Sequence, residues 1–444
     1  MKLHDWQIPH AGKLARSLKL HGVAKDGSDT GTGKTVIACK VIEQLGLMPF
    51  VVCPLSVVPS WRECVQKIFP RLKANTIWNY EKLKMGTTPF IKKKGRGYEW
   101  QLDRDKMVIV FDEDHKCKGP KSKNSKMMIA AKKQGYRILM LGATSFTSPL
   151  DMKAIGFALG LHDNTNWWRW CQANNCKPKP WGGLEYRATE DHLNLLHDMV
   201  YEGKGSRIRI KDLPEGTFPD NLIMSDAYAL PERDTQDISD LYTEMLAELS
   251  KLQETIDSDE YPSELTNMLR QRQEIELLKV PLFSDLVQDH VQGGSSVVVF
   301  VNFKATIEAV KERLLHLVCP ETGRWLVSEI VGDQSAEERQ ENIESFQDNH
   351  TKVILCALQA GGVGVNLHDL KGDAPRVSLI SPSYSAIDLR QALGRIHRSG
   401  AKSPAIQKII FAKDTVEEEV CYAVRAKLRN LDLINDKDVT PCGI

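Results

Sequence analysis

Short runs of β-branched and aromatic residues recur along the chain, and within each run the apolar positions are nearly continuous rather than alternating with polar ones. Segments with helical spacing separate the runs. Strands of this kind are typical of parallel sheets that helices cover on both faces. The runs fall into two sets, namely 50–53, 107–111 and 137–141, and then 297–301, 353–356, 377–380 and 409–411. The pattern therefore predicts an α/β fold with two doubly wound parallel-sheet lobes.

The stretch from about 231 to 279, between the two sets, is rich in Glu and Leu. It predicts helices with a break at Tyr261-Pro262-Ser263, because its apolar residues follow helical spacing at Leu241, Met245, Leu249 and Leu252. We therefore expect lobe 1 over residues 1–218 with a helical insertion at about 150–210, an acidic helical connection over 219–280, and lobe 2 over 281–444.

Composition is compatible with this organisation. The 444 residues suffice for two or three domains, and 42% hydrophobic residues suffice for real cores. Lys and Arg number 59 against 58 Asp and Glu, which excludes a polycation or an acidic disordered protein.

We expect an intracellular protein of a bacterial or host cytoplasm or a nucleus, neither secreted nor in a membrane, because neither a signal peptide nor a membrane-spanning apolar run is found. The ten cysteines lack paired spacing, which predicts free thiols rather than a zinc site.

Charge is placed unevenly along the chain. Residues 62–137 hold 20 Lys and Arg against 8 Asp and Glu, whereas residues 226–276 hold 4 against 14. We interpret the acidic stretch as a solvated face. For the basic stretch, binding to a phosphate backbone is at least as good an interpretation as a solvated face. Its run Lys92-Lys93-Lys94-Gly95-Arg96 is also compatible with a nuclear-localisation signal.

A glycine-rich loop precedes the helical pattern at 36–45, and it reads Ser28-Asp29-Thr30-Gly31-Thr32-Gly33-Lys34-Thr35. Such a loop lets backbone N–H groups surround phosphates at a helix N-terminus, while the lysine adds charge and the last hydroxyl can bind Mg²⁺. Ser28 replaces the usual first glycine. The loop predicts a nucleoside-triphosphate site formed by Thr30, Gly31, Thr32, Gly33, Lys34 and Thr35, with Thr35 as a Mg²⁺ ligand.

Two adjacent carboxylates, Asp112 and Glu113, follow the apolar run at 107–111. Beside a nucleotide-bound Mg²⁺ they acquire separate tasks: we expect Asp112 to hold the metal and Glu113 to deprotonate the attacking water.

These residues resemble the motifs of superfamily 2 nucleic-acid motors, and specifically the Snf2-like group, over nearly the full length. The similar segments are 3–7, 52–61, the phosphate loop, 112–115 with the following lysines, 142–145, 299–303, 360–367 and 391–398. Asp114 stands where Ala or Gly is common in that group, and Ser145 where proline is usual. Segments 170–182 and 207–209 look most like the fork-remodelling, annealing-helicase branch.

The resemblance implies further roles and two RecA-like lobes. Gln7 would contact adenine, while Gln391, Arg395 and Arg398 would act in catalysis. We expect the two arginines, which are three residues apart, to share one helix face and to reach the γ-phosphate as arginine fingers. The nucleic-acid contacts would be Lys118, Lys121, Lys123, Lys126, Thr144, Gly361 and Gly362.

The leading hypothesis is a monomeric, Mg²⁺-dependent ATPase that translocates on DNA and remodels branched or forked structures. A strand-separating helicase on DNA or RNA is the alternative with the same chemistry, and a non-hydrolysing ATP-switched DNA clamp is the alternative from another class. Trp167, Trp168 and Trp170 could stack on bases, although three bunched tryptophans more often pack in a core.

Overall fold

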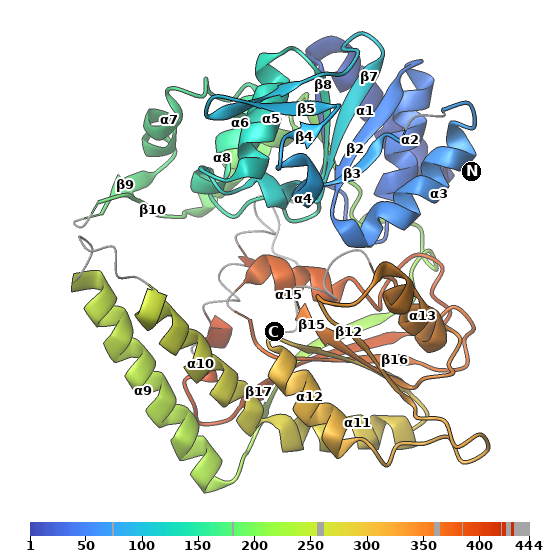
Figure 1. Cartoon of the computed structure of the whole chain (residues 1–444), viewed down its shortest axis with the longest axis vertical. Helices are drawn as coiled ribbons and strands as arrows, with labels where there is room; N and C mark the ends of the chain where they lie inside the picture. Colours follow the sequence, from blue (N-terminus) through green and yellow to red (C-terminus); the bar gives the residue numbers. More distant parts are fainter. Residues whose placement is uncertain are drawn as a thin grey trace. The chain divides into compact units, whose positions relative to one another are not determined.

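The computed structural model describes residues 1–72, 75–179, 182–254, 262–358, 365–383, 385–418, 420–422, 428 and 429. The chain divides into two compact units (Figure 1). Met1–Glu215, joined by Arg429, form lobe 1, and Gly216–Leu428 form lobe 2. Within the described residues, no helix is long and apolar enough to cross a membrane.

Lobe 1 is built on a six-stranded parallel sheet in the order β11-β1-β8-β7-β2-β3. Its strands are β1 (Val23–Asp26), β2 (Met48–Cys53), β3 (Ile77–Asn79), β7 (Met107–Asp112), β8 (Arg137–Leu141) and β11 (Gly205–Ser206). The three strands predicted for this lobe are β2, β7 and β8. They lie in the middle of the sheet, where both faces are covered.

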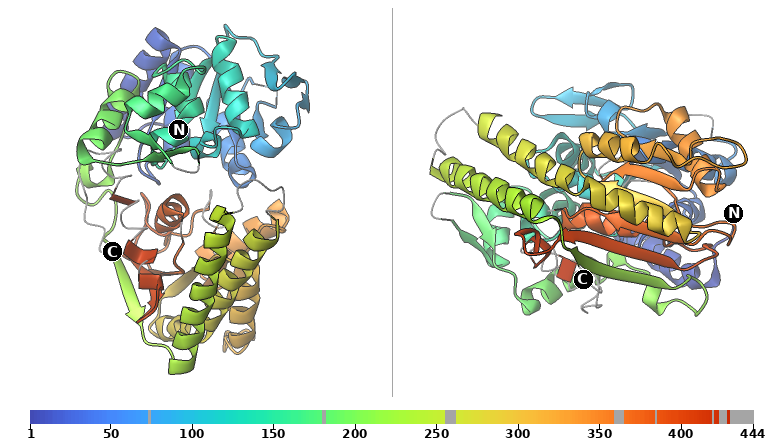
Figure 2. Two further views of the ribbon diagram at one scale, coloured as in Figure 1. Left: turned by 90° about the vertical axis from the view of Figure 1, so that its left-hand side faces the viewer. Right: turned by 90° about the horizontal axis from the view of Figure 1, so that it is seen from below.

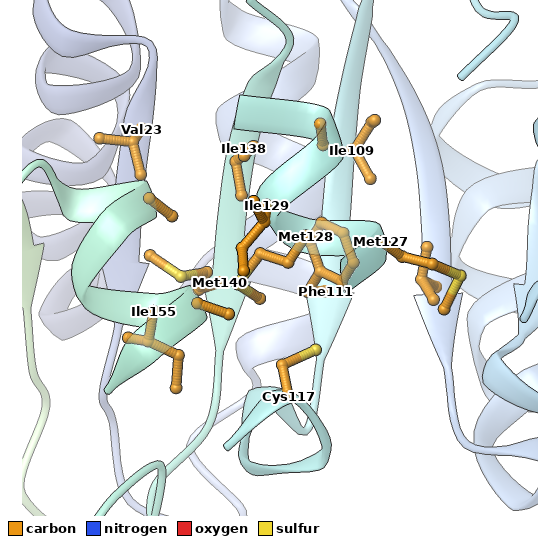
Figure 3. Close-up of a cluster of buried hydrophobic side chains, with 14 of the residues drawn as sticks. Val23, Ile109, Phe111, Cys117, Met127, Met128, Ile129, Ile138, Met140 and Ile155 are labelled. Carbon is orange, nitrogen blue, oxygen red and sulfur yellow. The ribbon is translucent and has the colours of Figure 1, made fainter. Parts of the chain in front are cut away.

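Helices cover both faces of this sheet. One face carries α1 (Ile8–His21), α2 (Lys34–Gln44) and α3 (Val58–Ile68), and the other carries α5 (Lys123–Lys133), α6 (Lys153–Leu159) and α8 (Glu190–Tyr201). Along β7, Val108 and Val110 pack into the first layer, whereas Ile109 and Phe111 pack into the second. Figure 3 shows part of the second layer, in which Met127 and Met128 lie beside Phe111. Burial on both faces explains why the strand lacks polar alternation.

Smaller elements extend lobe 1. A three-stranded antiparallel sheet consists of β4 (Thr87–Thr88), β5 (Ile91–Lys94) and β6 (Gly97–Trp100), and Gly95 turns between β5 and β6 with a φ of 57°. The expected insertion at 150–210 is not purely helical, because β9 (Cys176–Pro178) and β10 (Leu184–Tyr186) form a hairpin after α7 (Trp167–Ala173). The remaining short elements are η1 (Asp5–Gln7), η2 (Leu55–Val57), α4 (Tyr80–Leu83), η3 (Asp114–Cys117), η4 (Pro149–Asp151) and η5 (Ile210–Asp212).

Lobe 2 contains a second six-stranded parallel sheet, in the order β12-β17-β16-β13-β15-β14. Its strands are β12 (Asn221–Tyr228), β13 (Ser296–Val301), β14 (Val327–Ile330), β15 (Val353–Ala357), β16 (Arg376–Ile380) and β17 (Ala405–Ala412). Its helices include α11 (Val280–Gln292), α12 (Lys304–Arg313), α13 (Ala336–Gln347) and α15 (Ala386–Leu393). The four strands predicted for this lobe are β13, β15, β16 and β17. Each lobe is therefore a doubly wound α/β unit, and the predicted fold class is confirmed.

The expected helical connection is partly wrong. Its first part forms β12, which pairs with β17 as the edge strand of the second sheet, and a half-exposed edge strand leaves only a weak apolar pattern. The helices α9 (Glu232–Glu254) and α10 (Pro262–Leu278) follow and run side by side (Figure 2). Met245 is buried and Leu241 is half-buried, while the side chains of Leu249 and Leu252, and Tyr261 at the expected break, lie outside the described residues.

A buried carboxylate holds α10 to lobe 2. Glu276 accepts hydrogen bonds from Asn302 through its backbone N and Nδ2, from the backbone N of Phe303 and from Oγ1 of Thr306. Only 3% of Glu276 is exposed. The negative charge of its carboxylate is nevertheless compensated, because the hydrogen-bond donors lie at the N-terminus of α12. The long helices therefore belong to lobe 2 rather than to a free connection.

Candidate nucleotide and nucleic-acid site

The phosphate loop leads from β1 into α2. Gly33 is the N-cap of α2 with a φ of 85°, and no side chain caps this helix. The N–H groups of the first turn are therefore available to an anion. A Cβ at position 33 would lie 2.7 Å from Nε2 of Gln7, so glycine is required there for both space and backbone conformation.

Lys34 folds back over this loop. Its Nζ donates to the carbonyl oxygens of Ser28 at 2.8 Å and Asp29 at 3.0 Å. Burial lowers the pKa of Lys34 from its usual value, although the surrounding carboxylates oppose the shift. The ammonium group thus lies within the loop, where a phosphate would meet it.

Gln7 lies beside the same loop. Its Nε2 donates to the carbonyl oxygen of Thr32 at 2.8 Å, and its Oε1 accepts from the backbone N of His4 at 2.9 Å. The hydroxyl of Thr32 in turn donates to the carbonyl oxygen of Asp29 at 2.8 Å. Gln7, expected to contact adenine, therefore also fixes the conformation of the phosphate loop.

A buried polar network supports the loop from behind, and sequence reasoning missed it. Oδ1 of Asp26 lies 3.2 Å from Nε2 of His10 and accepts from the backbone N of Ser28. Burial alone would raise the pKa of Asp26, but the charge and hydrogen bond of His10, together with the charge of Lys34 and the hydrogen bond from Ser28, lower it. Arg207 pairs with Oδ1 of Asp29 at 2.6 Å. Apart from the contact between Ser28 and Asp26, the partners are far apart along the chain, so a single sequence offers no signal for them.

The carboxylates of Asp112 and Glu113 lie at the C-terminal end of β7. Oδ2 of Asp112 accepts from Nε1 of Trp61 at 2.7 Å, and Oε2 of Glu113 lies 3.3 Å from Nδ1 of His115. Burial and the neighbouring charge of Glu113 raise the pKa of Asp112 to about 7, although the Trp61 hydrogen bond and Lys34 oppose the shift. Glu113 itself has a φ of 50°, an unusual conformation for a residue with a side chain.

The oxygen ligands and N–H groups of this site fit a nucleotide with a bound divalent cation. A raised carboxyl pKa beside a second carboxylate marks a place where a cation would relieve unfavourable charge. Asp112 supplies carboxylate oxygen and Thr35 supplies hydroxyl oxygen, which are the hard ligands that Mg²⁺ prefers. The uncapped N-terminus of α2 suits the phosphates.

A buried ion pair lies directly behind Glu113. Nζ of Lys25 lies 3.1 Å from Oδ2 of Asp114, and neither side chain has exposed surface. The same Nζ donates to the carbonyl oxygens of Gly142 at 2.7 Å and Asp26 at 3.2 Å. A Cβ at position 142 would lie 2.3 Å from Oδ1 of Asp114, so the turn after β8 packs tightly on this carboxylate. Asp114, the departure from the family pattern, thus has a buried partner on β1.

The residues expected to contact nucleic acid divide by exposure. Lys121 and Lys123 are exposed, while Lys118 and Lys126 are half-buried. Thr144 is buried with 2% of its surface exposed, so its side chain has almost no surface to offer a strand. Gly361 and Gly362 lie outside the described residues.

The tryptophan cluster is divided between core and surface. Trp170 packs against the buried cluster around Cys171, and Nζ of Lys153 lies 5.2 Å from the ring centroid of Trp167. Trp168 is 46% exposed. Among the three, Trp168 has the most surface available for stacking.

The candidate catalytic residues of lobe 2 lie at the end of α15. The expectation that Arg395 and Arg398 share a helix face is wrong, because α15 ends at Leu393 with Gly394 as its C-cap. The backbone turns away there, and the carbonyl oxygen of Arg395 accepts from the backbone N of Leu367. Arg395 is 2% exposed and donates through Nε to the carbonyl oxygen of Gln391, whereas Arg398 is half-buried. Gln391 is buried on α15.

The charges of Arg398 and Arg376 act on His368, and we expect this histidine to make the stability of lobe 2 depend on pH. Burial and the charges of Arg398 and Arg376 lower the pKa of His368 to about 4. The unfolded chain, with an ordinary histidine pKa near 6.5, therefore takes up the proton first. We expect the free energy of unfolding to fall by at most about 3 kcal/mol on this account as the pH drops from about 6.5 to about 4. His368→Gln should reduce that loss in denaturant titrations across this range, and an unchanged pH profile would contradict the assignment.

Two family models match the chain. Residues 27–147 match "Type III restriction enzyme, res subunit", and residues 278–400 match "Helicase conserved C-terminal domain". The first match covers the phosphate loop and the paired carboxylates, and the second covers the end of α15.

Similar proteins and structures are also found. A putative ATP-dependent RNA helicase of Acanthamoeba polyphaga mimivirus is 33% identical over 475 residues, which span 99% of this chain and 84% of that protein. The helicase-like transcription factor of Homo sapiens is 32% identical over 110 residues, only 24% of this chain and 10% of that protein. The SWI2/SNF2 ATPase core of Sulfolobus solfataricus in complex with dsDNA is 18% identical, with a TM-score of 0.38, over 99% of this chain and 94% of that one.

Proposed function

The chain belongs to the Snf2-like group of superfamily 2 helicases, and on this basis we propose that it is a Mg²⁺-dependent ATPase that translocates on DNA and remodels branched or forked duplexes. Membership makes it an ATP-dependent helicase or translocase. The observation that carries the proposal is the placement of Lys34 inside an uncapped phosphate loop, with Asp112 and Glu113 in the same lobe.

Different residues of lobe 1 would bind the phosphates, hold Mg²⁺ and activate the attacking water. Lys34 and the N-terminal N–H groups of α2 bind the β- and γ-phosphates, and Gln7 and Thr30 to Gly33 shape the loop around them. Glu113 orients the attacking water and accepts its proton. Asp112 and Thr35 would hold Mg²⁺, which when bound neutralises charge that develops between the phosphates. Trp61 keeps the Asp112 carboxylate in one orientation.

Lobe 2 would supply the remaining catalytic groups. We assign Arg395 and Arg398 to transition-state charge on the γ-phosphate, and Gln391 to the same motif. Nε of Arg395 also donates a hydrogen bond to the carbonyl oxygen of Gln391 at the end of α15. Substitution of Arg395 would therefore affect the stability of the fold as well as catalysis.

Nucleic-acid binding would rest mainly on phosphate contacts. Lys121 and Lys123 offer exposed charge, and Lys118 and Lys126 are half-buried near them. Gly361 and Gly362 remain proposed contacts, whereas the buried side chain of Thr144 has almost no surface to contribute. Such contacts read no base sequence. The similarity to proteins named for DNA repair supports DNA as the substrate, and we propose that the protein acts as an intracellular monomer.

A strand-separating helicase on DNA or RNA is the second candidate. It is favoured by one observation, the name of the mimivirus relative, which is a putative ATP-dependent RNA helicase. The residues of the ATP site would serve this activity equally well.

Steady-state ATPase rates with different nucleic acids separate the two candidates. We expect duplex and forked DNA to raise the turnover more than single-stranded DNA or RNA does. If about four lysines contact duplex phosphates, the logarithm of affinity should fall with the logarithm of salt at a slope of roughly −3.6. Stimulation by single-stranded RNA alone would replace the proposal with the second candidate.

A further inference from the structure

Lobe 1 contains a basic cavity of about 420 Å³ that the ATP site does not use. It lies between the β4–β6 sheet, α5 and α6, which are neighbours in Figure 1. Five basic side chains from three segments line it, namely Lys94, Arg96, Lys126, Lys133 and Lys153. Among the residues that the structure describes, none that line this cavity is acidic.

The positive charge of the cavity is poorly compensated. Nζ of Lys94 lies 2.7 Å from Oε1 of Glu99, an exposed pair that binds weakly. The other four cations form no ion pair within the described part of lobe 1. Asp163, the carboxylate next to the lining residue Asn164, already accepts hydrogen bonds from Thr165 and Asn166. An anion entering the cavity would therefore meet cations with few competing carboxylates.

The walls of the cavity are held by hydrogen bonds. Gln134, the C-cap residue of α5, accepts from the backbone N of Trp100 at 2.8 Å and donates to the carbonyl oxygen of Tyr98 at 3.0 Å. The hydroxyl of Tyr98 donates to the carbonyl oxygen of Lys84. These bonds fix the small sheet against α5, so the basic groups project from a formed framework.

The lining has a polar group without a partner and an apolar floor. Oδ1 of Asn164 is buried and has no hydrogen-bond partner among the described residues. Tyr98, Ile129 and Ala130 are buried residues that also line the cavity. A ligand with both anionic and apolar parts fits this combination better than inorganic phosphate does, because a phosphate ion would leave the apolar floor uncovered.

We propose that this cavity binds the phosphodiester backbone of a nucleic-acid strand, at a site separate from the phosphate loop. The phosphates would contact the basic side chains and the sugars would cover the apolar floor. Binding there would be independent of base sequence. The inference rests on the proposed function, because it presumes that the protein handles a nucleic-acid strand.

Three variants with equal numbers of substitutions test the site. The cavity variant is Lys94→Ala/Arg96→Ala/Lys133→Ala, which changes exposed side chains and spares the core. The control variant is Lys19→Ala/Lys92→Ala/Lys93→Ala, which removes the same charge from exposed residues that do not line the cavity. The rescue variant is Lys94→Arg/Arg96→Lys/Lys133→Arg, which keeps the charge.

Fluorescence anisotropy with labelled forked DNA across a salt series is the main measurement. We expect the cavity variant to bind roughly tenfold more weakly, with a salt slope reduced by roughly 1.5, while the control and rescue variants stay close to the wild type. Basal ATP hydrolysis without nucleic acid and the unfolding temperature should be unchanged in all three.

Equal DNA affinity of the cavity and control variants would overturn the proposal. A cavity variant with lower basal ATPase and unchanged DNA affinity would also overturn it. If the wild type bound no nucleic acid at all, the proposed function would fail first.

Discussion

Glu113→Gln is expected to leave ATP bound while slowing hydrolysis by roughly 10²- to 10⁴-fold, the range typical of general acid–base catalysis. The amide preserves the size of the side chain and suits the left-handed backbone as well as glutamate does, but it cannot accept the proton of the attacking water. Lys34→Ala should instead weaken ATP binding, because Lys34 supplies the charge within the phosphate loop.

Single-turnover hydrolysis and equilibrium binding of ATP distinguish these effects. Glu63→Gln is a matched control, since Glu63 is an exposed glutamate on α3 that pairs only with its neighbour Lys67 among the described residues. Equal losses of ATP affinity in Glu113→Gln and Lys34→Ala would contradict the separate roles.

The core strands could be predicted from sequence, and the proposed ATP site could be located, because their signals are local. Continuous apolar runs arise where both faces of a strand are buried, as Val108 to Phe111 illustrate. A phosphate loop and its two carboxylates are likewise contiguous segments whose residue types follow from their chemistry. By contrast, β12 is a half-exposed edge strand, and its pairing with β17 depends on residues almost two hundred positions away.

The end of α15 shows a second limit. Spacing alone places Arg395 and Arg398 on one helix face, but α15 ends at Leu393 with Gly394 as its C-cap. Beyond this point a hydrogen bond from the backbone N of Leu367 to the carbonyl oxygen of Arg395 holds the chain. Helix ends are decided by such tertiary contacts as much as by local preference. The basic cavity of lobe 1 was invisible for the same reason, because its cations come from three segments that only the fold brings together.

The pair of Lys25 and Asp114 carries the second large effect. We expect Lys25→Met to reduce the free energy of unfolding by about 3–5 kcal/mol, because it leaves the Asp114 carboxylate buried without a counter-charge. Asp114→Ala should cost a similar amount by leaving the ammonium group unpaired. Unfolding in denaturant, followed by a signal from lobe 1, measures both losses.

The double variant Lys25→Met/Asp114→Ala should recover much of that stability. An apolar pair needs no counter-charge, and the backbone groups that Lys25 releases keep other partners. The carbonyl oxygen of Gly142 still accepts from Oγ of Ser145, and that of Asp26 still accepts from the backbone N of Gly142. Lys67→Met, at an exposed pair with Glu63, is the matched control and should cost less than about 1 kcal/mol.

If the double variant were as unstable as the single variants, Lys25 and Asp114 would each stabilise the fold through contacts other than their mutual ion pair. If stability recovers, hydrolysis in the double variant becomes informative, because Asp114 directly follows Glu113 and packs on the turn at Gly142. Recovered stability with a persistently low turnover would mean that the ion pair holds Glu113 in its left-handed conformation. Recovered turnover would mean that the pair serves folding alone, and that an alanine at 114 positions the catalytic carboxylate equally well.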